Sequence, residues 1–188
     1  MEYRNMTATI TPTETQSNEN DDYVVEGYAA NFVKYLLYEF DGVEVYEQID
    51  RRAFDGVDLT DVILQYDHQG KVYARGSNGS LELSVDDRGL KVRADLSGSA
   101  AARELYDEIK QGLVTRMSWG FTVSEDEFDR DTRTRVIKKV KKVYDVSAVS
   151  IPANDSTSIQ ARNLISVLNK EQRDAQHKRL KLKLKTII

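Results

Sequence analysis

The chain has 188 residues, of which 40% are hydrophobic and 31% are charged, and its formal net charge is −4 at pH 7. This length fits one domain with its own core, and the composition excludes fibrous and wholly disordered proteins. Because cysteine is absent, disulfides, thiolate catalysis and thiolate zinc sites are excluded too. The first residues lack a secretory signal pattern, and no apolar run could span a membrane, so we expect a protein of the cytoplasm with no membrane partner.

The two ends of the chain differ in composition from the part between them. Thr11 to Asp22 is rich in Thr, Asn, Asp and Glu, so residues 1–22 are predicted to be a mobile N-terminal lead-in. Residues 170–188 carry seven Lys or Arg and two acids, a net of +5, which leaves −9 for the rest. We therefore expect a folded domain over 23–162. A basic C-terminal tail over 163–188, helical or partly disordered, would bind a partner.

Strand patterns dominate the first half of the expected domain. Tyr23 to Ala30 and Val43 to Ile49 are rich in valine and tyrosine, which favour strands. Leu81 to Val85 and Leu90 to Ala94 alternate between apolar and polar residues around the turn sequence Asp86-Asp87-Arg88-Gly89. This alternation predicts a hairpin.

A helix and a second hairpin are predicted next. Ser99 can cap a helix from Ala100 to Gln111, whose Ala102, Leu105, Ile109 and Leu113 fall on one stripe and which Gly112 would end. Strands at 116–123 and 135–149 would follow, joined by a charged, solvent-exposed connector at 125–134. The predicted fold class is therefore α+β, with a mainly antiparallel, barrel-like core and one or two flanking helices.

Ser118 is the most informative residue, because it lies in the apolar stretch Arg116-Met117-Ser118-Trp119-Gly120-Phe121. A hydroxyl needs a neighbouring base to become a nucleophile near neutral pH. His68 and His177 are the only histidines, and His177 lies in the basic tail, where a solvated charged face is the better interpretation. Ser118 with His68 is thus almost the only available pair of nucleophile and base. The alternatives are a serine bonded to a neighbouring carbonyl and a histidine without a catalytic role.

Four spaced motifs together resemble a known family. They are Tyr23 to Ala30, Asp67-His68 after an apolar run, Met117 to Phe121, and Asp145 to Ala153. In this order they resemble the prohead maturation proteases of tailed bacteriophages, which are similar in fold to the herpesvirus assemblins. The resemblance covers roughly residues 20 to 165.

The resemblance implies a catalytic set of Ser118 as nucleophile, His68 as base and Asp145 as the acid that orients the imidazole. Asp67 is a rival for the third role because it adjoins His68. Neighbours on an extended strand point to opposite faces, however, which favours Asp145. Backbone amides would stabilise the oxyanion, and residues 150–155 are candidates.

The expected function is that of a serine endopeptidase of head maturation, which cuts capsid-protein precursor and scaffold segments, and itself, inside the prohead in the host cytoplasm. The basic tail would be a targeting segment or be removed by self-cleavage. Self-association is possible by analogy with related folds. A noncatalytic capsid-assembly or scaffolding module on the same fold is the alternative, because fold does not fix function.

No metal or cofactor is expected. The acidic cluster at 125–131 lacks the spacing and the glycine of an EF-hand loop. Gly76 to Ser80 has no lysine at phosphate-loop spacing. Nucleic acid is not an expected partner either. The alternating Leu180 to Lys185 segment could form a nucleic-acid-binding patch, an edge strand or part of an amphipathic helix.

Overall fold

The computed structural model describes residues 1–13, 23–40 and 42–150. The chain divides into two compact units, and Met1–Tyr35 together with Tyr46–Ala153 forms the larger one. The smaller unit includes residues 36–45, and thus most of β4 (Tyr35–Phe40) and the start of β5 (Val43–Ile49). The expected basic tail, with His177, lies outside the described residues.

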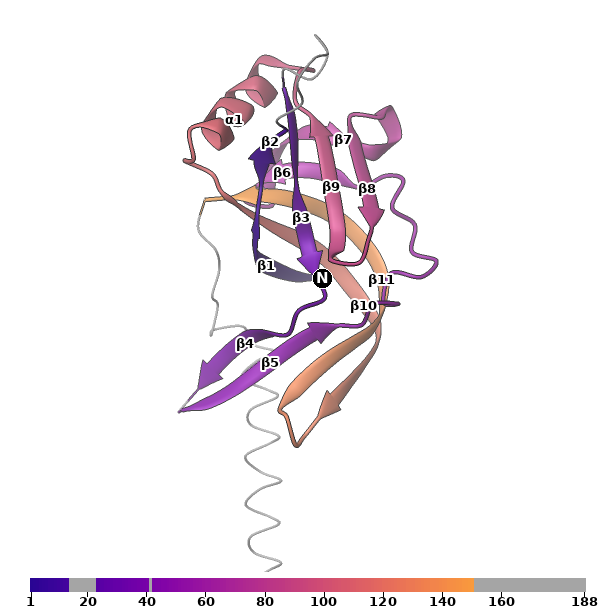
Figure 1. The fold of residues 1–188 in the computed structure, drawn as a ribbon. Helices are drawn as coiled ribbons and strands as arrows, with labels where there is room; N and C mark the ends of the chain where they lie inside the picture. The colour runs from indigo at the N-terminus through magenta and orange to yellow at the C-terminus, as the bar shows by residue number, and fades with distance from the viewer. Residues whose placement is uncertain (14–22, 41, 151–188) are drawn as a thin grey trace, which may run out of the picture. The chain divides into compact units, whose positions relative to one another are not determined.

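The larger sheet is built around two long strands, β10 (Arg116–Asp129) and β11 (Thr134–Val149), which pair antiparallel and form the long curved hairpin of Figure 1. β1 (Glu2–Thr9) pairs antiparallel with the other edge of β10. β11 pairs in parallel with β5 through its first residues and with β6 (Ile63–Tyr66) through its last. β7 (Gln69–Arg75) pairs antiparallel with β6.

The smaller sheet is antiparallel, with its strands in the order β2 (Thr11–Pro12), β3 (Val24–Asn31), β9 (Gly89–Asp95) and β8 (Leu81–Val85). The predicted hairpin of β8 and β9 is confirmed. Leu90, Val92 and Ala94 of β9 are buried, whereas the residues between them are half-buried, as a period of two requires.

One α-helix, α1 (Ala100–Lys110), is found among the described residues, together with the short 3-10 helix Gly76–Asn78. The predicted N-cap is confirmed, since the Ser99 hydroxyl accepts a hydrogen bond from the Ala102 amide at 3.1 Å. Ala102, Leu105 and Ile109 are buried as predicted. Leu113 is 68% exposed, because the helix ends at Lys110 and Gly112, whose φ is +73°, then turns the chain.

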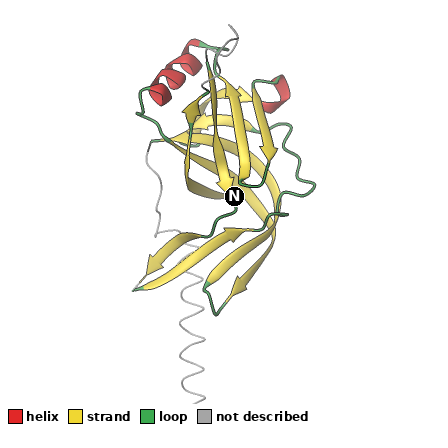
Figure 2. Cartoon of the chain, viewed as in Figure 1, coloured by secondary structure: helices red, strands yellow, loops and turns green. Residues whose placement is uncertain are grey.

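Strands dominate the fold, as Figure 2 shows, and the predicted α+β class is confirmed. The term barrel-like is too loose, because neither sheet closes among the residues that the structure describes. No helix in this part of the chain is long and apolar enough to cross a membrane.

Two segments are more ordered into strands than the sequence suggested. The described part of the lead-in forms β1 and β2. The connector expected at 125–134 is shorter, a turn at 130–133, because β10 extends to Asp129 and includes the acids at 125–129. Glu125 pairs with Lys139 across the strands, and Arg135 forms an ion pair with Asp126 at 2.5 Å. Opposite charges facing each other across the pair extend the ladder into solvent.

Candidate active site

Three side chains from three elements meet in one hydrogen-bonded chain. Ser118 lies on β10, Asp145 lies on β11, and His68 lies in the two-residue loop between β6 and β7. The Ser118 Oγ is 2.6 Å from His68 Nε2, and His68 Nδ1 is hydrogen-bonded to Asp145 Oδ1. The structure thus brings together the three residues that the sequence analysis singled out, in the order hydroxyl, imidazole, carboxylate.

The strand that carries Ser118 is anchored in the core. Met117, Trp119 and Phe121 are completely buried, and the rings of Trp119 and Phe121 stack with their centroids 3.8 Å apart. Because side chains alternate along a strand, Ser118 and Gly120 point to the opposite face. The hydroxyl is therefore held by a backbone that the core fixes on one side.

Gly120 leaves room for the carboxylate of the site. It pairs with Asp145 in the register of β10 and β11, and the Asp145 side chain lies over it. A glycine in a strand often marks the close approach of another backbone or of a ligand. The group that approaches is instead a side chain of the site itself.

His68 is placed by a strained two-residue loop. The φ angles of Asp67 and His68 are 47° and 57°, in the left-handed region that two-residue hairpin loops require. Gln69 and Gly70, which follow the loop, begin β7. The loop is tied to β11, because the Asp67 amide donates to the Ala148 carbonyl at 3.0 Å.

Asp67 and Asp145 have different partners, although both are near His68. Asp145 contacts the imidazole, whereas the carboxylate of Asp67 accepts hydrogen bonds from the amide and the hydroxyl of Ser150, at 3.0 and 2.8 Å. The Ser150 amide is thus already bonded to Asp67. The other residues proposed as oxyanion donors, 151–155, lie outside the described residues.

Ser147 is a residue of the site that the sequence analysis missed. It is completely buried, and its hydroxyl donates to Asp145 Oδ1 at 3.0 Å while accepting from the backbone amide of His68 at 3.2 Å. It therefore links the carboxylate to the loop that carries the imidazole. A sequence signal existed, because Ser147 is two residues after Asp145 and so lies on the same face of the strand.

A buried ion cluster lies beside the site and holds β1. Arg4 forms ion pairs with Glu47 and Glu2, both at 2.6 Å, and Arg135 bonds the same two acids at 2.9 and 2.6 Å. The Tyr35 hydroxyl also donates to Glu47, which is completely buried. Two acids and two arginines balance each other, so a carboxylate is kept in the interior without net charge.

Burial and the neighbouring charges of the cluster shift the pKa values of Glu2, Arg4 and Tyr35. Burial alone would raise the pKa of Glu2, but hydrogen bonds and charge from Arg135, with the charge of Arg4, outweigh burial and lower it. The pKa of Arg4 is raised, since Glu47 overcomes the opposing effect of burial. Burial, followed by the charge of Glu47, raises the pKa of Tyr35 well above its ordinary value. At neutral pH Glu2 and Arg4 are therefore charged and Tyr35 is neutral.

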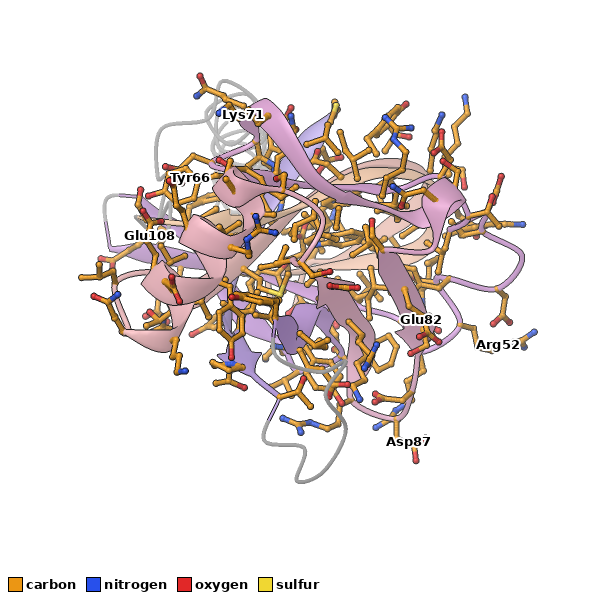
Figure 3. All side chains as sticks on the ribbon, turned by 90° about the horizontal axis from the view of Figure 1, so that it is seen from above. Arg52, Tyr66, Lys71, Glu82, Asp87 and Glu108 are labelled. Carbon is orange, nitrogen blue, oxygen red and sulfur yellow. The ribbon has the colours of Figure 1, made fainter. Side chains whose placement is uncertain are left out.

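An open pocket of about 480 Å³ adjoins the His68 loop. It lies between the start of β7 and α1, and Figure 3 shows Tyr66, Lys71 and Glu108 on this side of the molecule. Burial, followed by the charge of Glu108, raises the pKa of Tyr73 in its wall. Among the described residues, no group of three or more His, Cys, Asp or Glu side chains could hold a metal ion.

Comparison with known proteins gives two matches. Residues 11–171 match the model of the caudovirus prohead serine protease family. The chain is also similar to the prohead protease of Enterobacteria phage HK97, with 32% identity over 80 residues, which span 42% of this chain and 36% of that relative. The match thus covers little more than a third of the relative's length. No solved structure matches the chain.

Proposed function

Because the chain belongs to the caudovirus prohead serine protease family, we propose that it is a serine endopeptidase in which Ser118, His68 and Asp145 carry out the chemistry. The observation that carries this proposal is the 2.6 Å contact between the Ser118 hydroxyl and His68 Nε2, with Asp145 on the other ring nitrogen. A hydroxyl, an imidazole and a carboxylate in this order form the arrangement that acyl transfer to serine requires.

The proposed reaction is a two-step hydrolysis. Ser118 Oγ attacks the carbonyl carbon of the scissile peptide while His68 Nε2 takes the hydroxyl proton. His68 then gives that proton to the leaving amine, and the C–N bond breaks to leave an ester on Ser118. A water molecule, deprotonated by His68, attacks the ester carbon. The C–Oγ bond then breaks, Ser118 Oγ takes the proton back from His68, and the new carboxyl terminus is released. Asp145 holds the Nδ1 hydrogen throughout and stabilises the imidazolium that forms after each proton transfer.

The proposed substrates are precursor segments of the major capsid protein and scaffold segments, cut inside the prohead in the host cell. The support is the family match, together with the description of the phage HK97 relative as a prohead protease. Cleavage of the chain itself, near its basic tail, belongs to the same proposal.

The proposal is tested by incubating the purified protein with the capsid-protein precursor of its phage and following fragments by intact mass. The wild type should produce discrete fragments, and Ser118→Ala should produce none. A fluorophosphonate should label Ser118 in the wild type only. Cleavage that persists in Ser118→Ala would remove Ser118 from the mechanism. No cleavage and no labelling, also in assembled shells, would instead favour a noncatalytic assembly module.

A further inference from the structure

The first six residues of the chain, which we call the strap (residues 1–6), close off the proposed nucleophile. Ser118 is completely buried. The groups found over it belong to the strap, since the Tyr3 ring lies 4.3 Å from the His68 ring and the Arg4 carbonyl accepts a hydrogen bond from Ser118 Oγ at 3.0 Å. A peptide carbonyl cannot approach Ser118 while these groups are in place.

The bond to Arg4 also affects the proton that catalysis must move. A serine hydroxyl has one hydrogen, and a carbonyl can only accept a hydrogen bond. The Arg4 carbonyl at 3.0 Å and His68 Nε2 at 2.6 Å therefore compete for the one hydrogen of Ser118. Attack needs the arrangement in which the hydroxyl donates to a bare Nε2. The strap thus offers this hydrogen a second acceptor, which leads away from attack.

The strap lies where an extended peptide would bind. β11 occupies one edge of β10, and the strap pairs antiparallel with the other edge, with Asn5 opposite Ser118. An open strand edge is a general binding site for extended peptides, because backbone hydrogen bonds supply affinity for any sequence. The edge of β10 beside Ser118 becomes available to such a peptide only when the strap leaves.

The chain is built so that the strap can leave without unfolding the rest. The register of β1 on β10 is interrupted between Met6 and Thr9, so the strap is paired separately from the residues after it. Ile10 is buried, at 2% exposure, and Thr11–Pro12 pairs with β3. The segment after the interruption therefore keeps its place in the core.

The strap is held by its ladder with β10, by the contact of Tyr3 with His68 and by ion pairs. Glu2 and Arg4 bind Arg135 and Glu47 in the ion cluster described above. On the opposite face Met1 and Tyr3 remain 56% and 48% exposed, so they bury little apolar surface. Removing the strap's charges from this cluster should therefore raise the fraction of molecules in which the strap is detached.

From these observations we propose that the strap is a built-in competitor of the substrate: residues 1–6 occupy the binding strand along β10, and an extended peptide substrate must displace them before Ser118 can react. This inference rests on the proposed function. It adds that the described state is inhibited, and that activity depends on how often the strap detaches.

The test compares two variants that each remove one acidic partner of Arg135. Glu2→Ala removes the partner on the strap, whereas the control Asp126→Ala removes a partner on β10 and leaves the strap intact. We expect a fluorophosphonate to label Ser118 about three- to tenfold faster in Glu2→Ala, because the open fraction rises. Asp126→Ala should be labelled at the wild-type rate. Hydrogen exchange of the amides of residues 2–6 should rise in Glu2→Ala alone.

A synthetic peptide with the sequence of residues 1–9 provides a second readout on the full chain. It should slow the labelling of Glu2→Ala, and a scrambled peptide of the same composition should not. If the exchange of residues 2–6 is unchanged in Glu2→Ala, the double variant Glu2→Ala/Arg4→Ala removes both strap charges and takes its place.

The possible outcomes separate the strap from the proposed function. One outcome is that the wild type and a variant whose hydrogen exchange shows a detached strap are labelled at equal rates. This would overturn the strap proposal and leave the proposed protease function standing. Failure of the 1–9 peptide to slow the labelling would also count against the strap. Absence of labelling in every variant, including those with a detached strap, would overturn the proposed function and the strap together.

Discussion

The carboxylate of Asp145 lies directly over the backbone of Gly120, its partner across the strands. A Cβ atom added at Gly120 would come within 2.2 Å of Asp145 Oδ2, and within 2.8 and 2.9 Å of atoms of Met1 and Tyr3. Real Cβ atoms do not approach other atoms this closely, so any side chain at position 120 would push Asp145 away from His68.

Gly120→Ala is therefore expected to lower kcat by about 100-fold or more, because a displacement of about 1 Å in a catalytic group has effects of that size. The fold should survive, since alanine is compatible with a strand. The matched control is Gly98→Ala, where an added Cβ meets nothing within 4 Å. Peptide cleavage and circular dichroism of both variants check the prediction, and a Gly120→Ala enzyme with wild-type kcat would contradict it.

Asp145→Asn and Asp67→Asn should separate the two acids near His68. Asp145→Asn is expected to reduce kcat by roughly 10⁴-fold, because an amide cannot fix the imidazole in the required tautomer. Asp67→Asn keeps a side-chain oxygen that accepts the hydrogen bond from the Ser150 amide, so kcat should fall by less than about tenfold in this variant. Steady-state kinetics on one peptide give both values. A larger loss in Asp67→Asn than in Asp145→Asn would exchange the roles assigned to them.

Ser147→Ala removes the hydroxyl that links Asp145 to the His68 loop. Because two buried partners lose a hydrogen bond, we expect a loss of roughly 1–3 kcal/mol in the free energy of unfolding. A fall in kcat of roughly tenfold should accompany it, with KM little changed. Ser124→Ala, whose exposed hydroxyl donates to Lys139, is the control. Denaturant unfolding and kinetics test this, and equal effects in the two variants would argue against a positioning role for Ser147.

The stabilising effect of Glu2 should depend on pH. Its pKa is lowered from the ordinary 4.5, and it faces Arg4, Arg135 and the buried Glu47. The contribution of the Glu2 charge to the free energy of unfolding is therefore complete at pH values above 4.5. It is lost as the pH falls through the lowered pKa that Glu2 has in the folded state. After allowance for partial exposure, Glu2→Gln should destabilise the protein by about 1 kcal/mol at pH 7.

At pH 3 the difference between the wild type and Glu2→Gln should be smaller than at pH 7. Urea unfolding at both pH values measures it. A difference that stays constant, or grows toward acid pH, would show that the ion cluster does not hold β1 in the way described.

Elements whose packing follows from local pattern could be predicted from the sequence. The alternation in β8 and β9 gave their pairing, and Ser99 with the stripe of Ala102, Leu105 and Ile109 gave α1. The prediction that Leu113 belongs to the apolar stripe was wrong, because the helix ends before this residue. The exact end of a helix depends on the turn that follows, here the one that Gly112 makes.

β1 could not be found in this way. Its Glu2 and Arg4 are charged, which in a local pattern indicates exposure, yet they are largely buried by partners at Glu47 and Arg135, 43 or more positions away in the chain. Such burial is decided by tertiary contacts alone. His68 could be found because the chain has only two histidines, whereas Ser118 and Asp145 were assigned through their motifs and the family resemblance that these motifs carry. The reason given against Asp67 was different from the real geometry, since Asp67 and His68 form a left-handed loop and no extended strand.

The alternation along β10 joins the core and the proposed site in one strand. Met117, Trp119 and Phe121 face inward and Ser118 faces the site, so one backbone serves both. On heating, Ser118 should therefore keep its position for as long as the packing of Met117, Trp119 and Phe121 lasts. The ability of a fluorophosphonate to label Ser118 should be lost at the same temperature as this packing.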